Sequence, residues 1–289
     1  MFQLQTRTPQ RWLEVARALR LDAILVLRRF FVVSGITGSR DGYRVQLRDW
    51  SSAQHSHGAH IVVASHERAI APLELRPQEP RSLLSHRPIR RDVETGDERF
   101  DAEVILNGPE AVALALLDDR IRWLVRELFV VRGRVCAGRV SVHCAYPPPS
   151  SFDDSGSPVA VTARFAEKAL RLTTALAAPL DLEARLCERA AHEPHPGVRA
   201  RVLMVLARSF GSGNAAREVF RDACGAGDEE VRLQAALALG VEGRSTLLEI
   251  AHRTEGDNNQ AVRAITALGA HLPFEQAIAI LTDSLRRSH

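Results

Sequence analysis

The densest group of metal-ligating side chains in the sequence is a run of histidines, at His55, His57 and His60. A His-x-His pair on a strand places both rings on one side, and imidazole nitrogens suit zinc or copper. The stretch has no carboxylate or thiol to complete a four-ligand set, and its serines and glycine are typical of a loop before a strand at 61–64. We therefore expect a solvated loop and no bound metal. The alternative is a metal-dependent enzyme that uses these three histidines.

A second cluster gathers four carboxylates within seven residues, at Asp97, Glu98, Asp101 and Glu103. Paired carboxylates can bind a divalent cation or transfer protons. The spacing differs from that of a calcium-binding loop, and Arg99 lies among the acids as a salt-bridge partner. This favours a structural turn.

Arrangements that would support nucleophilic catalysis are missing from the sequence. His143 and Cys144 are neighbours, and neighbouring residues of a strand point to opposite faces, so they cannot act as a pair. The glycines Gly35 and Gly38 are not followed by the Gly-Lys-Ser/Thr of a phosphate-binding loop. We therefore expect no catalytic residues and no cofactor.

Arginine provides nearly all of the positive charge. Of the 38 basic residues 37 are Arg and one is Lys168, and the net charge is only +3. Residues 1–150 carry 22 Arg against 17 acidic residues, so the excess of positive charge lies in the first half. Arginine-rich stretches can contact phosphates, although few aromatic residues lie near them to stack on bases. The candidate phosphate contacts are Arg81, Arg87, Arg90, Arg91, Arg132, Arg134 and Arg139.

Features that determine cellular location point to the cytoplasm. The four cysteines form no Cys-x-x-Cys pair, which fits a reducing compartment. The first residues lack the pattern of a signal peptide. No stretch approaches the roughly 20 apolar residues of a membrane span.

A proline-rich segment predicts where the chain divides into two domains. Three prolines and a Ser/Asp/Gly-rich run predict a linker at 147–158, between a domain at 1–146 and a helical domain at 159–289. The first domain mixes helical periodicity with strand-like runs, and we expect an α+β fold with a mostly antiparallel sheet. The expected elements are helices at 9–21 and 159–176, a helix or helix pair at 110–128, and strands at 24–33, 43–47, 61–64, 102–106, 129–131 and 134–143.

A repeated Val-Arg pair organises the second half. It occurs at Val198-Arg199, Val231-Arg232 and Val262-Arg263, with spacings of 33 and 31 residues. A period of this length in a helical region indicates a solenoid of helix pairs. Asp228 and Asp257 precede two of the copies and are suited to cap the new helices. The expected partner helices span 215–224, 246–252 and 274–285.

The run Asp-Glu-Glu-Val-Arg-Leu-Gln-Ala-Ala-Leu-Ala-Leu-Gly at 228–240 resembles the second helix of a HEAT repeat. Residues 195–207 match it less well and 257–269 are shortened, so the resemblance covers about 180–289. It implies a ladder in which Arg199, Arg232 and Arg263 bond turn aspartates such as Asp228 and Asp257. It also implies a concave protein-binding face, on which we place Arg201, Arg208 and Gln234.

Taken together, the sequence favours a non-catalytic adaptor or self-assembling protein that uses a HEAT-like solenoid to bind a protein partner or further copies of itself. The first alternative is a nucleic-acid-binding protein with an arginine-rich surface. The metal-dependent enzyme is the second alternative.

Overall fold

The computed structural model describes residues 8–29, 32–52, 55–66, 73–78, 93–128, 130–136, 139–146, 158–252 and 258–269, together with 278 and 282. The chain forms two compact units. The sheet unit comprises residues 1–93, 99–109 and 120–179. The helical unit comprises residues 94–98, 110–119 and 180–289. The segment 110–119 thus joins the helical unit, and the helix after the proline run joins the sheet unit, which differs from the division expected from the sequence. Residues 147–157 of the expected linker lie outside the described residues.

The sheet unit is built on eight strands in the order β1-β2-β3-β4-β8-β7-β5-β6, and every strand pair in it is antiparallel. This confirms the α+β class with a mostly antiparallel sheet. The strands are β1 (Asp22–Arg29), β2 (Val32–Arg40), β3 (Tyr43–Ser52), β4 (His55–His66), β5 (Leu73–Pro77), β6 (Val104–Asn107), β7 (Val130–Cys136) and β8 (Arg139–Tyr146).

Two strands were not expected from the sequence. Strand β2 contains Gly35 and Gly38, and β5 is a short strand that ends in a proline. The turn at Asp41-Gly42 joins β2 to β3, with φ of 52° and 81°. Positive φ at both central residues is the type I′ geometry that fits a two-residue hairpin, which explains the Asp-Gly pair.

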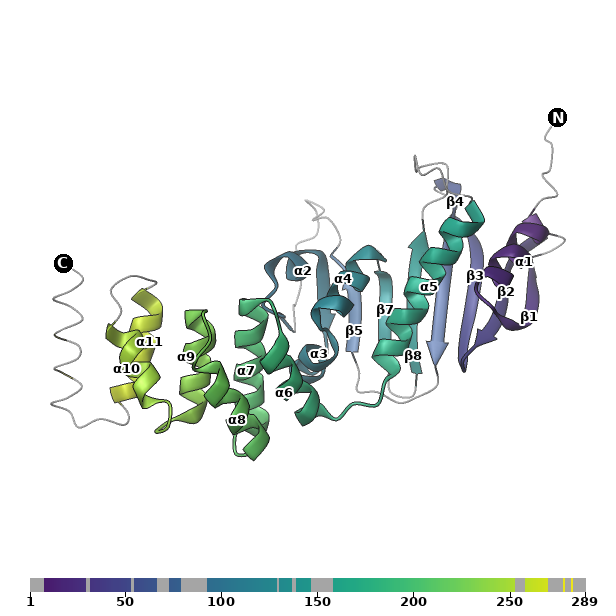
Figure 1. Ribbon diagram of the computed structural model, residues 1–289. Coiled ribbons are helices and arrows are strands. Elements are labelled where there is room, and N and C mark those ends of the chain that lie inside the picture. The colour runs from purple at the N-terminus through teal and green to yellow at the C-terminus, as the bar shows by residue number, and fades with distance from the viewer. Residues whose placement is uncertain are drawn as a thin grey trace. The chain divides into compact units, whose positions relative to one another are not determined.

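Helices α1 (Thr8–Ala18) and α5 (Pro158–Ala177) lie across one face of the sheet (Figure 1). The amphipathic pattern expected for α1 is confirmed, since Trp12, Val15 and Ala16 are at most 1 % exposed. The sheet unit also contains most of helices α2 (Glu98–Glu103) and α4 (Asp119–Glu127). Within the described residues, no helix is long and apolar enough to cross a membrane.

The helical unit contains α3 and the helices that follow α5. Their bounds are α3 (Glu110–Leu116), α6 (Leu182–His192), α7 (Pro196–Phe210), α8 (Asn214–Ala223), α9 (Glu229–Leu239), α10 (Arg244–His252) and α11 (Asn258–Gly269). The helices expected around the three Val-Arg pairs and at 215–224 and 246–252 are therefore confirmed. The helix expected at 274–285 falls almost entirely outside the described residues.

The apolar side chains of the helical unit pack in two clusters. One is centred on α6, α7, α8 and α9 and includes Leu114 and Ala115 of α3. The other joins α9 to α10 and α11. The first two valines of the Val-Arg pairs are buried, with Val198 and Val231 at most 1 % exposed. Val262 is 58 % exposed, because α11 buries Ala264, Ile265 and Leu268 instead. The third copy of the pattern is therefore out of phase with the first two.

Candidate functional site

The two faces of the sheet differ in what covers them. Successive residues of a strand point to opposite faces, so Ile36, Gly38 and Arg40 of β2 share one face. Ile36 is fully buried opposite Leu47 of β3. Arg40 reaches α5 and α1 from the same face, because its Nη1 donates to Glu167 Oε2 at 2.6 Å and to the Leu19 carbonyl at 3.2 Å. This face is therefore the one packed against the helices.

The opposite face carries exposed arginines. On β3, Arg44 and Arg48 alternate with the buried Val45 and Leu47, and both arginines are exposed. On β5, Arg76 is exposed next to the buried Leu75. The alternation of Arg with a β-branched or leucine residue is the pattern of a strand with one wet face and one core face.

The register of the strands extends this face across the sheet. One continuous row of directly opposed residues runs from Arg44 of β3 through Ser65 of β4, Ser141 of β8 and Arg134 of β7 to Glu74 of β5. Directly opposed residues of an antiparallel pair share a face. The arginines of β7 and β8 therefore occupy register positions on the same face as those of β3 and β5.

We call this surface the arginine face and define it by Arg44, Arg48, Arg76, Arg132, Arg134 and Arg139. Arg132 lies two residues from Arg134 on β7, and Arg139 lies two residues from Ser141 on β8. Neighbouring strands are about 4.8 Å apart and residues i and i+2 about 7 Å, so Arg134 lies within about 10 Å of both Arg132 and Arg139. On the described strands from β3 to β5, Glu74 is the one carboxylate at a register position of this face.

The structure thus brings together three of the seven arginines expected to contact phosphate. Arg132, Arg134 and Arg139 join one face, whereas Arg81, Arg87, Arg90 and Arg91 lie outside the described residues. Sequence reasoning missed Arg44 and Arg48. The signal that could have found them is the strict alternation of polar and apolar residues from Arg44 to Arg48.

The histidine run is strand, not loop. His55 to His66 form β4, with Ser52 opposite His55 and Asp49 opposite His60. The expected loop at these residues is therefore wrong, because pairing with β3 continues to the start of the run. No cluster of metal-ligating side chains occurs among the described residues.

The carboxylate cluster lies mainly in a helix and not in the turn expected from the sequence, since Glu98–Glu103 form α2. Glu103 accepts two hydrogen bonds from Arg126, at 2.6 and 2.9 Å, and Arg99 lies 3.9 Å from it. Asp97 is held by a bond from its backbone N–H to Thr95 Oγ1 at 3.2 Å. Phe100 is fully buried within this segment. The carboxylate of Glu103 is therefore held by arginine side chains.

The two arginines expected on a concave solenoid face are engaged within the helical unit. Arg201 Nη2 lies 2.7 Å from Glu110 Oε1, and Arg208 Nη1 lies 3.2 Å from Glu110 Oε2. Glu110 is the first residue of α3, where a carboxylate is also favoured by the helix dipole. Gln234 donates to Glu230 of its own helix at 2.7 Å. Sequence reasoning missed Glu110, because its partners lie about 90 residues away in the chain.

The expected ladder of arginines and turn aspartates differs from what is observed. Arg199 Nε donates to the Ala190 carbonyl at 2.7 Å, and Arg263 pairs with Glu230 at 2.8 Å. Asp228 accepts from the Val231 N–H at 3.0 Å and so caps its own helix, as its sequence position predicts. Asp257 lies outside the described residues. Arginines of this pattern therefore bond helix ends and glutamates here, not turn aspartates.

Arg232 is the exception among these arginines. It is 8 % exposed, and two of its nitrogens, Nε and Nη2, make no hydrogen bond within the part of the chain that the structure describes. The nearest carboxylates are Glu249 at 3.9 Å and Glu229 at 4.0 Å.

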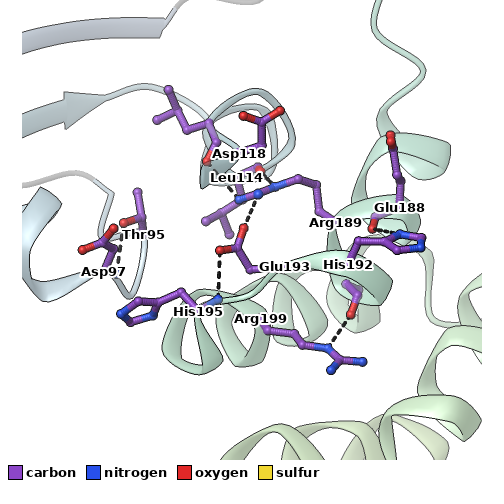
Figure 2. A network of polar contacts seen from close by, with 12 residues as sticks. Thr95, Asp97, Leu114, Asp118, Glu188, Arg189, His192, Glu193, His195 and Arg199 are labelled. Carbon is purple, nitrogen blue, oxygen red and sulfur yellow. Dashed lines mark hydrogen bonds and ion pairs between the residues drawn. The ribbon is translucent and has the colours of Figure 1, made fainter. Parts of the chain in front are cut away.

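A buried polar network fixes α3 to α6 (Figure 2). Arg189 Nε donates to the Leu114 carbonyl at 3.0 Å and its Nη2 to the Leu117 carbonyl at 2.9 Å, at the C-terminal end of α3. Its third bond goes to Glu193, whose side chain is fully buried and whose other oxygen accepts from the His195 N–H at 3.2 Å. The last carbonyls of a helix lack partners within the helix, so the guanidinium group caps α3.

Comparison of the chain with protein-family models, with curated proteins and with solved structures finds no match. The HEAT-like resemblance of residues 180–289 therefore remains a prediction.

Proposed function

We propose that the protein binds nucleic acid in the cytoplasm through the arginine face, without a catalytic step. The observation that carries this proposal is the placement of six arginines and a single carboxylate on one face of the strands from β3 to β5. The net charge of the whole chain is only +3, so a positive surface must come from local clustering.

The chemistry of arginine supports a phosphate ligand. A guanidinium group stays charged at physiological pH and offers a planar set of donors that matches phosphate oxygens. Six contacts with phosphates would release counterions and give a salt slope, d log K/d log [salt], of roughly −4 for a single strand and −5 for a duplex. Binding of this kind reads the backbone and is independent of base sequence.

The helical unit offers less support for the other reading, a protein partner on a concave solenoid face. Arg201 and Arg208 already share Glu110, and Gln234 is bonded to Glu230. A partner carboxylate would have to compete with these intramolecular contacts.

The test is a titration of a fluorescent oligonucleotide over a range of salt concentrations. The variant Arg44→Gln/Arg48→Gln/Arg76→Gln removes three arginines of the arginine face, each with an exposed side chain. Its salt slope should be smaller in magnitude than that of the wild type by about 2 to 3 units, which corresponds to a loss of affinity of roughly 100-fold at 0.1 M salt.

The matched control is Arg17→Gln/Arg164→Gln/Arg171→Gln, which removes three exposed arginines from α1 and α5 of the same unit. Both triple variants lower the net charge equally, so a difference between them reports position and not total charge. Equal effects of the two variants would reject the arginine face as the site. Tight binding of polyglutamate by the wild type, with no binding of oligonucleotides, would reject nucleic acid as the ligand.

A further inference from the structure

The two edge strands of the eight-stranded sheet differ in how far other described segments pair with them. Beyond β6, Val93 makes an antiparallel bridge to Leu106, so that edge is partly covered. Strand β1 is the other edge, and it pairs with β2 alone among the described strands. An edge strand presents a row of backbone N–H and C=O groups that can pair with another strand.

The centre of β1 exposes apolar residues, whereas edge strands commonly carry charged residues there. Its sequence is Asp-Ala-Ile-Leu-Val-Leu-Arg-Arg, and Leu25 and Val26 are 65 % and 42 % exposed. These two residues point to opposite faces of the sheet, so neither face alone explains their exposure. A strand added at the edge would cover both of them at once.

The charges at the ends of β1 indicate which strand would fit. Asp22 begins the strand and Arg28 lies near its end, and both side chains are exposed. A parallel copy in register would place like charges side by side. An antiparallel copy with Leu25 opposite the partner's Leu25 places Asp22 opposite the partner's Arg28, at both ends of the pair. The strand is therefore self-complementary.

Two-fold symmetry is compatible with this register. A two-fold axis that relates two antiparallel strands is perpendicular to the sheet and preserves its faces, so one residue must lie opposite its own copy. With Leu25 on the axis, Ile24 lies opposite Val26 of the partner, and Asp22 lies opposite Arg28 of the partner. The bulges of β1 lie between Asp22 and Leu25 and between Leu27 and Arg28. They flank the regular centre and disfavour a shifted register.

We propose that the protein forms a two-fold dimer in which β1 pairs antiparallel with β1 of a second copy, centred on Leu25. The sheet then continues across the dimer. Since the paired stretch is short, the interface is small and the dimer dissociates at micromolar concentrations. The inference is independent of the ligand of the arginine face.

Sedimentation velocity over a range of protein concentrations tests the proposal, with circular dichroism to verify that each variant is folded. The wild type should pass from monomer to dimer with a midpoint of order 10 to 100 µM. Asp22→Arg and Arg28→Asp should each raise that midpoint at least tenfold, because each places like charges opposite one another. The double variant Asp22→Arg/Arg28→Asp should restore it.

The control is Glu14→Arg, which makes the same change of charge as Asp22→Arg at an exposed position of α1. It should leave the midpoint unchanged. A wild type that is monomeric at every concentration would overturn the proposal. A dimer that neither single charge reversal weakens, or that the double variant fails to rescue, would also overturn it, because the interface would then lie elsewhere.

Discussion

Removal of the guanidinium group of Arg189 should destabilise the helical unit far more than removal of its neighbour on the same helix. Arg189 is 5 % exposed, and its partner Glu193 has a fully buried side chain. The change Arg189→Met keeps an unbranched side chain of similar length. It removes the cation that pairs with a buried carboxylate and the hydrogen bonds to two carbonyls at the C-terminal end of α3.

The expected magnitude follows from these losses. Breaking a buried ion pair by removing one partner costs about 3–5 kcal/mol, and each buried acceptor left without a donor costs about 1–3 kcal/mol. These terms overlap because they share one site, so we expect a total of about 4 kcal/mol. With a urea m-value of about 2 kcal/mol/M, the unfolding midpoint shifts by about 2 M.

The matched control is Arg185→Met, one turn earlier on α6. Arg185 also bonds the segment after α3, with Asp118 at 3.0 Å, and a neighbour on its own helix, Glu188, at 2.5 Å. It is 36 % exposed, so its pairs are hydrated and the change should cost less than about 1 kcal/mol. The double variant Arg189→Met/Glu193→Gln should be more stable than Arg189→Met, because it removes the unpaired charge.

The assay combines urea unfolding by circular dichroism with hydrogen exchange of peptides from 110–117. Exchange is informative because Arg189 caps α3, so protection of that helix should fall in Arg189→Met and persist in Arg185→Met. Equal midpoints for the two variants, or unchanged protection of residues 110–117, would refute the role assigned to Arg189.

Three further predictions concern a close backbone contact, an exposed ion pair and two thiols. A Cβ at Gly197 would lie 2.5 Å from the Gly96 carbonyl oxygen, so Gly197→Ala should lower the thermal midpoint, whereas Gly227→Ala, with open space around the glycine, should lower it less in the same melt. Hydrogen bonds from Arg217 and Arg221 lower the pKa of the exposed Glu242, so any stability it contributes is present at neutral pH and is lost as pH falls through the lowered pKa. Melts of Glu242→Gln and wild type in low salt should therefore converge in acid, and a difference that grows in acid would contradict this. Burial raises the pKa of Cys187, with the charges of Glu183 and Asp181 adding to it, and burial also raises the pKa of Cys224. Both thiols should therefore react with an alkylating reagent at pH 7.5 more slowly than free cysteine does, as measured by mass spectrometry of the peptides. Alkylation rates equal to that of free cysteine would contradict the burial.

The helical unit could largely be predicted because its signals are local. Asp228 caps α9 from within four residues of sequence, and the Val-Arg pairs recur with a period that a reader can find without a structure. The local pattern failed at Val262, where α11 turns a different side toward its neighbours. The place of α3 could not be predicted, because Arg189 and Glu110 make their contacts across roughly 75 and 90 residues of chain.

The arginine face could be predicted only in part, because it too depends on contacts between residues far apart in the sequence. The alternation from Arg44 to Arg48 indicates one polar side of a strand, but it does not say which strands lie next to it. The order β3-β4-β8-β7-β5 joins residue 44 to residue 134, and that pairing is set by the whole sheet. The glycines of β2 and the proline of β5 hid two of the strands, because both residues are also typical of turns.

The central claim, that nucleic acid lies on the arginine face, is tested most directly by photo-cross-linking to a bromouracil-substituted oligonucleotide, followed by mass spectrometry of the cross-linked peptides. We expect cross-linked peptides from β3, β5, β7 and β8, and their loss when unlabelled oligonucleotide competes. Competable cross-links confined to α7, α9 and α11 would contradict the account and place the binding surface on the helical unit.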